Sequence, residues 1–219
     1  MEYITSSDFH FKDTAVALGK FEGIHRGHQL LMDEVKKQEL HGLRSVVFTF
    51  DRPTRLTLTG DTEYKQIYTK KERREILEKR GIDILIEHPF TKEFAALTPD
   101  RFIREVLVEK VGAKVIVVGT DFHFGKNRSG SITDLEKLEE ECGYHLIVVE
   151  KLQLNGKDIS STRIRASLEK GAMEEAKALL GRNYSVSGEI LHGNALGRTI
   201  QVPTINQQVP SFKLLPPNG

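Results

Sequence analysis

Two histidines and two glycines lie close together in the stretch "GKFEGIHRGHQLL", from Gly19 to Leu31. The stretch follows an apolar run and precedes a helical pattern, so it lies where a strand turns into a helix. Gly23 and Gly27 would let a ligand approach the backbone, and a helix beginning near His28 would direct free N–H groups at an anion. His25 and His28 could both donate to phosphate oxygens, which suits this spacing better than metal ligation. The alternative is two surface histidines on a loop.

A second polar cluster lies in "ISSTRIR", from Ile159 to Arg165. Its hydroxyl residues precede a helical pattern: Ser160, Ser161 and Thr162. Such hydroxyls commonly cap helices. However, Arg163 and Arg165 place cations at the head of the same helix, where the helix dipole disfavours them, and a bound anion would offset that cost. Structural capping and phosphate binding both remain open for this stretch.

A third polar stretch, "GTDFHFGKNRSG" from Gly119 to Gly130, leaves the end of a predicted strand. Loops at the carboxyl ends of parallel strands bind ligands in open α/β sheets. Asp121 could accept from an amine or hydroxyl, and Lys126 and Arg128 could reach phosphates. A solvated turn is the alternative.

The elements that must position these residues alternate along the chain. Apolar runs predict strands over 15–21, 45–50, 82–88, 114–122 and 144–150. Helical patterns cover 28–42, 69–81, 98–112 and 131–143, followed by two shorter ones over 159–171 and 172–181. This alternation predicts an α/β fold with βαβ units around a parallel sheet.

The sequence changes character near Gly181 to Tyr184, after which it is turn-rich and β-like. We therefore expect two domains, 1–183 and 184–219. The second stretch is too short to close an independent β core. A strand over 184–191 is expected to present an unpaired edge.

Composition limits the class of protein. With 32 Lys and Arg against 31 Asp and Glu, the net charge is +1, so bulk charge gives no reason to expect nucleic acid or an anionic membrane as partner. Cys142 is the only cysteine, which excludes an internal disulfide and a thiolate metal cage. No run is long enough to span a bilayer. We expect a soluble cytoplasmic protein whose oligomeric state the sequence leaves open.

Taken together, the motifs resemble those of one family. "GKFEGIHRGHQLL", "VVFTFDRP", "GTDFHFG", "ISSTRIR" and "GRTIQVPTIN" occur in the order and rough spacing of the bacterial bifunctional riboflavin kinase/FMN adenylyltransferases, the prokaryotic FAD synthetases. The resemblance covers essentially the whole chain. It implies a Rossmann-like nucleotidylyltransferase domain, followed by the start of a small riboflavin kinase β-barrel.

The resemblance also implies an activity and a site. The N-terminal domain would transfer AMP from ATP to FMN, giving FAD and pyrophosphate with Mg²⁺, and riboflavin phosphorylation would belong to the full-length protein. The implied catalytic residues are His25, His28 and Arg165. The implied ATP-binding residues are Gly19, Phe21, Gly23, Gly27, Asp121, Ser160, Ser161, Thr162 and Arg163. The implied flavin-binding residues are Phe50, Arg52, Phe122 and Phe124.

The chain departs from the family pattern at several positions. Lys20 stands where Asn is usual, Glu22 where Asp is usual, and "RPT" (52–54) where a PHP-type run is usual. His123 replaces a commoner Arg. The acceptor side is therefore less clearly specified than the ATP side.

The C-terminal stretch resembles the start of the kinase module. Thr204 and Asn206 match the family's ATP and Mg²⁺ site, whereas Gln201 stands where Gly is usual. The sequence stops before the rest of the barrel and its acidic catalytic base, so we expect a piece of a longer protein.

Two other functions stay open. The same transfer chemistry could serve a different phosphorylated acceptor, which the altered "RPT" segment would permit. Alternatively, the chain could be a catalytically weak regulatory protein that binds flavin or nucleotide.

Overall fold

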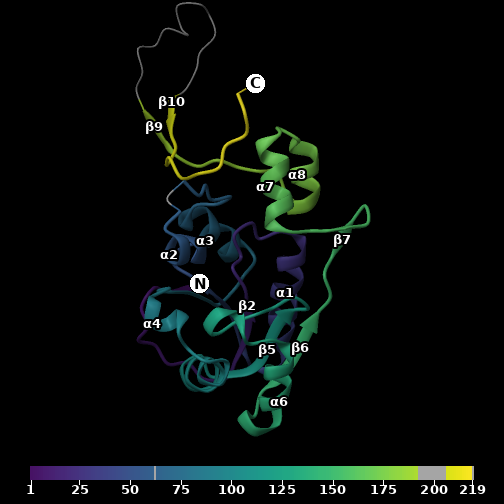
Figure 1. Ribbon diagram of the computed structural model, residues 1–219. Coiled ribbons are helices and arrows are strands. Elements are labelled where there is room, and N and C mark those ends of the chain that lie inside the picture. Colours follow the sequence, from purple (N-terminus) through teal and green to yellow (C-terminus); the bar gives the residue numbers. More distant parts are fainter. Residues whose placement is uncertain (62, 192–205, 219) are drawn as a thin grey trace, which may run out of the picture.

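The computed structural model describes residues 1–61, 63–191 and 206–218. Its main unit is a six-stranded parallel sheet in the order β1-β4-β3-β2-β5-β6 (Figure 1). The strands are β1 (Glu2–Ile4), β2 (Thr14–Leu18), β3 (Arg44–Phe50), β4 (Ile84–His88), β5 (Ala113–Gly119) and β6 (His145–Val149). The predicted parallel α/β fold is confirmed.

Helices and short strands complete the described residues. The helices are α1 (Arg26–Lys37), α2 (Thr54–Thr59), α3 (Lys70–Lys79), α4 (Lys92–Ala95), α5 (Pro99–Arg101), α6 (Ile132–Cys142), α7 (Ser161–Glu169) and α8 (Met173–Leu180), with 3-10 helices η1 (Gln38–His41) and η3 (Lys126–Arg128) and the π-helix η2 (Phe102–Lys110). The short strands are β7 (Gln153–Leu154), β8 (Lys157–Asp158), β9 (Glu189–Leu191) and β10 (Asn206–Gln208).

Two helix predictions need correction. The helix expected to begin near His28 begins at Arg26, because His25 rather than a later residue caps it. The helix expected over 98–112 is a single turn, α5, that continues as the π-helix η2. Thr98 and Pro99 start it as predicted, since Thr98 accepts from the Arg101 N–H and Pro99 occupies the first turn.

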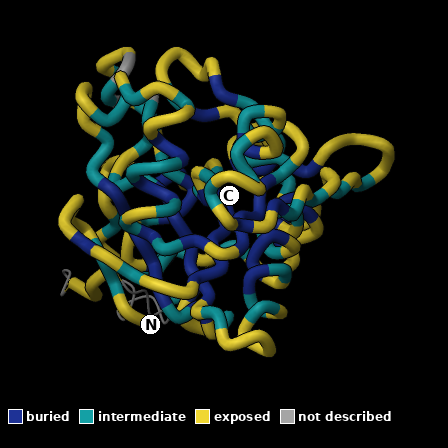
Figure 2. Tube along the Cα trace, turned by 90° about the horizontal axis from the view of Figure 1, so that it is seen from below, coloured by how far each residue is buried: buried dark blue, intermediate teal, exposed yellow. Residues whose placement is uncertain are grey.

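The sheet is buried on both faces, as its continuous apolar strands require. On one face α1 packs with Leu31, Met32 and Val35. On the other face lie η2 and α6, whose Leu107 and Leu135 belong to the second core cluster. Each fully buried side chain of this size contributes about 1.5–3 kcal/mol. Figure 2 shows the buried segments gathered at the centre of the molecule.

The C-terminal part lies against the end of the α/β unit. A third core cluster joins α7 and α8 to Ile67, before α3, and to Leu214 near the chain end. The Gln66 N–H donates to Phe212 O (2.6 Å), and the Leu214 N–H donates to Gln66 O (2.8 Å). Figure 1 shows this C-terminal segment running between β10 and helices α7 and α8.

The expected unpaired edge at 184–191 needs correction. Its strand is shorter, β9, and pairs antiparallel with β10 through Glu189 and Gln208 at one end and Leu191 and Asn206 at the other. The boundary between 183 and 184 stays a prediction.

A buried ion pair ties the C-terminal segment to α3. Lys213 Nζ donates to Glu72 Oε2 (2.7 Å), Ile67 O (2.7 Å) and Ser185 O (3.2 Å). The Lys213 and Glu72 side chains are 0% and 3% exposed. Glu72 also forms the capping box of α3 with Thr69.

Among the described residues, no helix combines the length and apolar composition needed to cross a bilayer.

Candidate active site

The order of the strands creates a crevice beside β2. From β2 the chain moves to β3 and β4 on one side, then crosses back to place β5 on the other side of β2. Such a switch point, at the carboxyl ends of the strands, is where open α/β sheets bind ligands. The loop from Gly19 to His25 leaves β2 at this point, and Asp121 follows the neighbouring β5.

The loop after β2 has an unusual backbone. Phe21 has φ of 44° and Ile24 has φ of 41°, values in the left-handed region that a β-branched residue rarely adopts. Both residues are fully buried, so the structure exposes no part of Phe21, one of the predicted ATP-binding residues, to a ligand. A Cβ at Gly19 would lie 3.1 Å from the Phe21 ring, which explains glycine there. Strain of this kind is concentrated at functional sites.

The two predicted histidines stack at the N-terminus of α1. The His28 N–H donates to His25 Nδ1 (3.3 Å), which makes His25 the helix cap. Their ring centroids lie 3.7 Å apart with an interplanar angle of 16°. A Cβ at Gly27 would lie 3.3 Å from the His25 ring, so the glycine leaves space for that imidazole.

Burial keeps both imidazoles neutral. It lowers the pKa of His25 to about 4, with Arg182 acting in the same direction and Asp121 against it. Burial, His25 and Arg182 hold the pKa of His28 well below its ordinary value. Because His25 Nδ1 accepts a hydrogen bond, its neutral ring carries the proton on Nε2. His28 Nδ1 is buried and has no hydrogen-bond partner among the described residues.

The first turn of α7 meets the β2 loop. A Cβ at Gly23 would lie 3.3 Å from Ile164 Cδ1 and 3.5 Å from Ser161 Oγ. Ser160 caps α7 by accepting from the Arg163 N–H (3.2 Å), and Thr162 is exposed on the first turn. The interpretation of these hydroxyls as helix caps is therefore confirmed for Ser160. The structure also brings α7 against the histidine loop.

Arg165 is held at this junction by two side chains. It forms an ion pair with Glu22, and its guanidinium lies over the Tyr64 ring at 4.3 Å from the centroid. Tyr64 Oη donates to Glu22 Oε2 (2.7 Å). Glu22 thus links the β2 loop to α7 across 143 residues of sequence.

Arg163 points elsewhere. Its guanidinium donates to Glu175 Oε1 (2.8 and 3.0 Å), Leu154 O (2.9 Å) and Lys157 O (3.2 Å). These bonds join α7 to α8 and to the β7–β8 hairpin. The geometry gives the predicted phosphate role of Arg163 no support.

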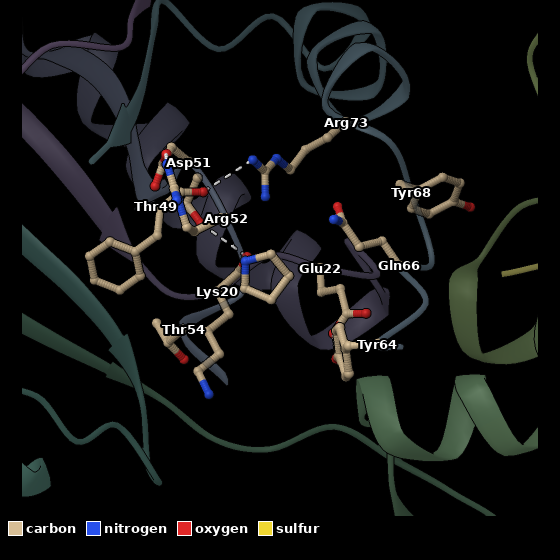
Figure 3. Close-up of a pocket in the computed structure, with 12 residues that line it drawn as sticks. Lys20, Glu22, Thr49, Asp51, Arg52, Thr54, Tyr64, Gln66, Tyr68 and Arg73 are labelled. Atoms are coloured by element: carbon tan, nitrogen blue, oxygen red, sulfur yellow. Dashed lines mark hydrogen bonds and ion pairs between the residues drawn. The ribbon is translucent and has the colours of Figure 1, made fainter. Parts of the chain in front are cut away.

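A pocket lies beside the histidine loop, at the carboxyl ends of β2 and β3 (Figure 3). Its lining comprises Lys20, Glu22, Thr49, Phe50, Asp51, Arg52, Pro53, Thr54, Tyr64, Gln66, Tyr68 and Arg73. Thr49 Oγ1 donates to Lys20 O (2.9 Å) and Arg73 Nη2 to Phe50 O (3.2 Å), contacts that hold its walls together. Lys20, Glu22 and the "RPT" segment, three departures from the family pattern, all meet here.

The predicted flavin residues divide between two places. Phe50 and Arg52 line this pocket, whereas Phe122 and Phe124 stack on each other after β5. Phe124 is buried. A row of ring contacts runs from Phe50 through Phe94, Phe102 and Phe124 to Phe122, with centroids 5.4–6.0 Å apart. Both ends therefore lie on the same face of the sheet.

The remaining predictions concern anionic and metal-binding residues. Asp121 is exposed and pairs with Lys151 (3.1 Å). The part of the chain that the structure describes contains no group of three or more His, Cys, Asp and Glu side chains able to hold a metal. Asn206 lies exposed in β10, and Thr204 falls outside the described residues.

Sequence reasoning missed two residues that support the histidine loop. Arg182 and Gln29 both donate to backbone carbonyls of this loop, including Ile24 O (2.8 and 3.0 Å). Arg182 lies outside the motifs and acts on a carbonyl 158 residues away in sequence. Gln29 stands inside the "GKFEGIHRGHQLL" stretch, but its role appears only in the fold, where it binds both Ile24 O and the distant Leu180 O. Tyr64, which contacts Arg165, was missed for the same reason.

Comparison with known proteins gives two family matches. The FAD synthetase family model matches residues 8–163, and the riboflavin kinase model matches residues 180–219. The crystal structure of a Streptococcus pneumoniae protein described as a macrolide-efflux protein superposes with a TM-score of 0.89 at 31% identity, covering 100% of this chain and 73% of that one.

Curated relatives agree with these matches. A bifunctional riboflavin kinase/FMN adenylyltransferase of Listeria monocytogenes is 34% identical over 99% of this chain and 69% of its own length. Its namesake from Buchnera aphidicola (Schizaphis graminum) is 33% identical over 89% of this chain, which spans 63% of that relative. The chain therefore belongs to the FAD synthetase family of bifunctional riboflavin kinase/FMN adenylyltransferases.

Proposed function

We propose that the chain carries an FMN adenylyltransferase, which moves AMP from ATP to FMN and releases pyrophosphate. The nucleotide would lie in the crevice between β2 and β5, and the FMN phosphate in the adjoining pocket. Riboflavin phosphorylation, the other activity in the names of the relatives, is not part of this proposal for the chain.

The observation that carries the proposal is the meeting of two motifs far apart in sequence. The capped start of α1, with His25 and His28, lies against the first turn of α7 through Gly23 and Ser161. Two helix N-termini and neutral imidazole donors thus converge beside the switch point, an arrangement suited to a polyphosphate.

The reaction asks mainly for positioning and charge stabilisation. An oxygen of the FMN phosphate attacks the α-phosphorus of ATP, and the bond from that phosphorus to the oxygen bridging to the β-phosphate breaks. That oxygen leaves with pyrophosphate. The Nε2–H of His25 would donate to the phosphate oxygens on which charge develops, and the buried Nδ1 of His28 would find its missing partner there. Arg165 would lie beside the departing charge.

Mg²⁺ is expected from the family resemblance. Because the described residues contain no cluster of metal ligands, the ion would be held mainly by the phosphates of the nucleotide. It would neutralise charge on those phosphates, while the residues of this chain orient the nucleotide and acceptor.

One observation favours a second candidate, transfer to a different phosphorylated acceptor. Lys20, Glu22 and Arg52 stand at positions where the family usually has other residues, and all three line one pocket. Changes gathered in a single subsite are what a change of acceptor would produce.

A chromatographic assay with MgATP tests the proposal by following FAD formed from FMN. The proposal predicts FAD from FMN, and in His28→Ala a loss of roughly 100-fold or more with the fold intact, since a donor to developing charge is removed. Arg104→Gln, which removes an arginine on the far helix η2, serves as the control. Binding of ATP without FAD formation, followed by turnover of another phosphorylated acceptor, would favour the second candidate. A folded His28→Ala enzyme with unchanged rate would refute the site.

A further inference from the structure

Arg182 lies just after α8 and reaches the histidine loop. Its Nη1 donates to Ile24 O (2.8 Å) and Leu180 O (3.3 Å), and its Nη2 donates to Gly23 O (3.0 Å). The guanidinium also lies over the Tyr68 ring, 5.0 Å from the centroid. A single half-buried cation thus joins the loop after β2 to the end of α8.

Gln29 makes a parallel connection. Its Nε2 donates to Ile24 O (3.0 Å) and Leu180 O (2.8 Å), two of the three carbonyls that Arg182 binds. Both side chains therefore hold Ile24 in its left-handed conformation, which costs about 1–3 kcal/mol unless the surroundings impose it.

Arg182 also acts on the histidines through its charge. After burial itself, it is one of the groups that lower the pKa of His25 and of His28, whereas Asp121 raises that of His25. The guanidinium favours neutral rings because a protonated imidazole would repel it. The hydrogen bonds of Arg182 to the loop and its positive charge therefore both affect His25 and His28.

We propose that Arg182 is a positioning residue for adenylyl transfer: it fixes the strained turn at Gly23 and Ile24 and so directs His25 and His28 at the nucleotide. This inference rests on the proposed function. Arg182 lies in the segment matched by the riboflavin kinase model, residues 180–219. Because the expected domain boundary lies between 183 and 184, Arg182 stands at the junction of the two expected domains.

The test compares Arg182→Met and Arg182→Lys with the wild-type chain by NMR titration of the histidine rings and by kinetics. In Arg182→Met, the pKa of His25 is expected to rise from about 4 toward its ordinary value. For FAD formation, kcat is expected to fall roughly 10- to 100-fold, as displaced catalytic groups cause. The KM for FMN should change little, since Arg182 does not line the acceptor pocket. Arg182→Lys should recover part of both effects because it keeps the charge.

Controls separate positioning from general destabilisation. Arg104→Met removes an arginine that pairs with Asp100 and Glu141 on the far side of the sheet, and should leave the His25 titration and kcat unchanged. Gln29→Leu removes bonds to the same carbonyls without removing a charge, so kcat should fall while the His25 pKa rises less. If Arg182→Met does not fold, Gln29→Leu and Arg182→Lys together test the proposal.

Two failures can be told apart. If the wild-type chain forms no FAD, the proposed function fails, while the NMR titration still tests whether Arg182 controls the histidines. If folded Arg182→Met keeps both the wild-type His25 titration and the wild-type kcat, the positioning role of Arg182 is refuted.

Discussion

Replacing Lys213 with methionine should destabilise the protein strongly, because it removes one partner of a buried ion pair. Methionine keeps most of the apolar stem but loses the three hydrogen bonds of Nζ, to Glu72, Ile67 O and Ser185 O. The ammonium also lies 4.7 and 4.5 Å from the ring centroids of Tyr68 and Tyr184, and these contacts disappear.

The loss of stability in Lys213→Met can be estimated from the Glu72 carboxylate, which stays buried without its partner. Burial acts to raise the pKa of Glu72, but hydrogen bonds from Lys213 and from the Thr69 and Ser187 N–H groups outweigh it and hold that pKa below its ordinary value. After the substitution the carboxylate keeps only the backbone donors. Removing one partner of a buried pair costs about 3–5 kcal/mol, which lowers Tm by roughly 6–20 °C in a chain of this size.

Urea unfolding of wild type and variant measures this loss. Lys65→Met is the matched control: Lys65 also reaches the C-terminal segment, at Ser211 O (2.8 Å), but is exposed, so a change within about 0.5 kcal/mol is expected. Adding Glu72→Gln to Lys213→Met should restore part of the stability, since the unpaired charge is gone. A cost below about 1 kcal/mol for Lys213→Met would refute the argument.

Three further predictions concern the histidine loop. The contribution of neutral His25 to the free energy of unfolding is fully present above pH 6.5 and is lost as the pH falls toward 4, because His25 of the unfolded chain is protonated before His25 of the folded chain. With a pKa of about 4 in the folded protein, the loss of unfolding free energy approaches about 3 kcal/mol. Urea unfolding from pH 7 to 4 should show this slope in wild type and less of it in His25→Asn; equal slopes would contradict it. Gly27→Ala should lower kcat for FAD formation about tenfold, because the added Cβ would displace the His25 ring. The melting temperature should stay the same or rise, because alanine has a better helix propensity than glycine. An unchanged kcat would show that the His25 ring has room for the methyl group. Glu22→Gln removes the charge that pairs with Arg165 and should lower kcat/KM for FAD formation by about tenfold, whereas Glu22→Asp keeps the charge on a shorter side chain and should restore less than half of that loss. Steady-state kinetics measure both variants, and a wild-type kcat/KM in Glu22→Gln would contradict the role of Glu22 in positioning Arg165.

Much of the sheet could be predicted because its strands are long apolar runs. The strands around Val47 and Val117 are buried on both faces, and such runs are visible in sequence without knowledge of the fold. β1 was missed because it is only three residues long and half-exposed at the sheet edge. The π-helix η2 was missed because its apolar spacing resembles that of an α-helix.

The site was predictable only where its residues stand together in sequence. His25 and His28 are three positions apart and the hydroxyls of α7 are adjacent, so local patterns identified them. The contacts of Arg182 with Gly23 and Ile24 span 159 and 158 residues, and no local signal marks them. Arg163 shows the limit of a local pattern: its motif position predicts a phosphate ligand, a prediction that stays open, whereas in the structure its guanidinium joins α7 to α8 and to the β7–β8 hairpin.

The position of β2 also determines when the molecule can be completed during synthesis. β2 pairs on one side with β3, which emerges soon after it, and on the other with β5, which ends only at Gly119. Translation adds about 5–20 residues per second, so for several seconds the nascent chain carries an apolar strand with one open hydrogen-bonding edge. Such an edge can pair with a neighbouring chain. The arrival of β5 removes this aggregation hazard and, in the same step, forms the crevice, so a nucleotide that binds there as proposed would act only on the later stages of folding.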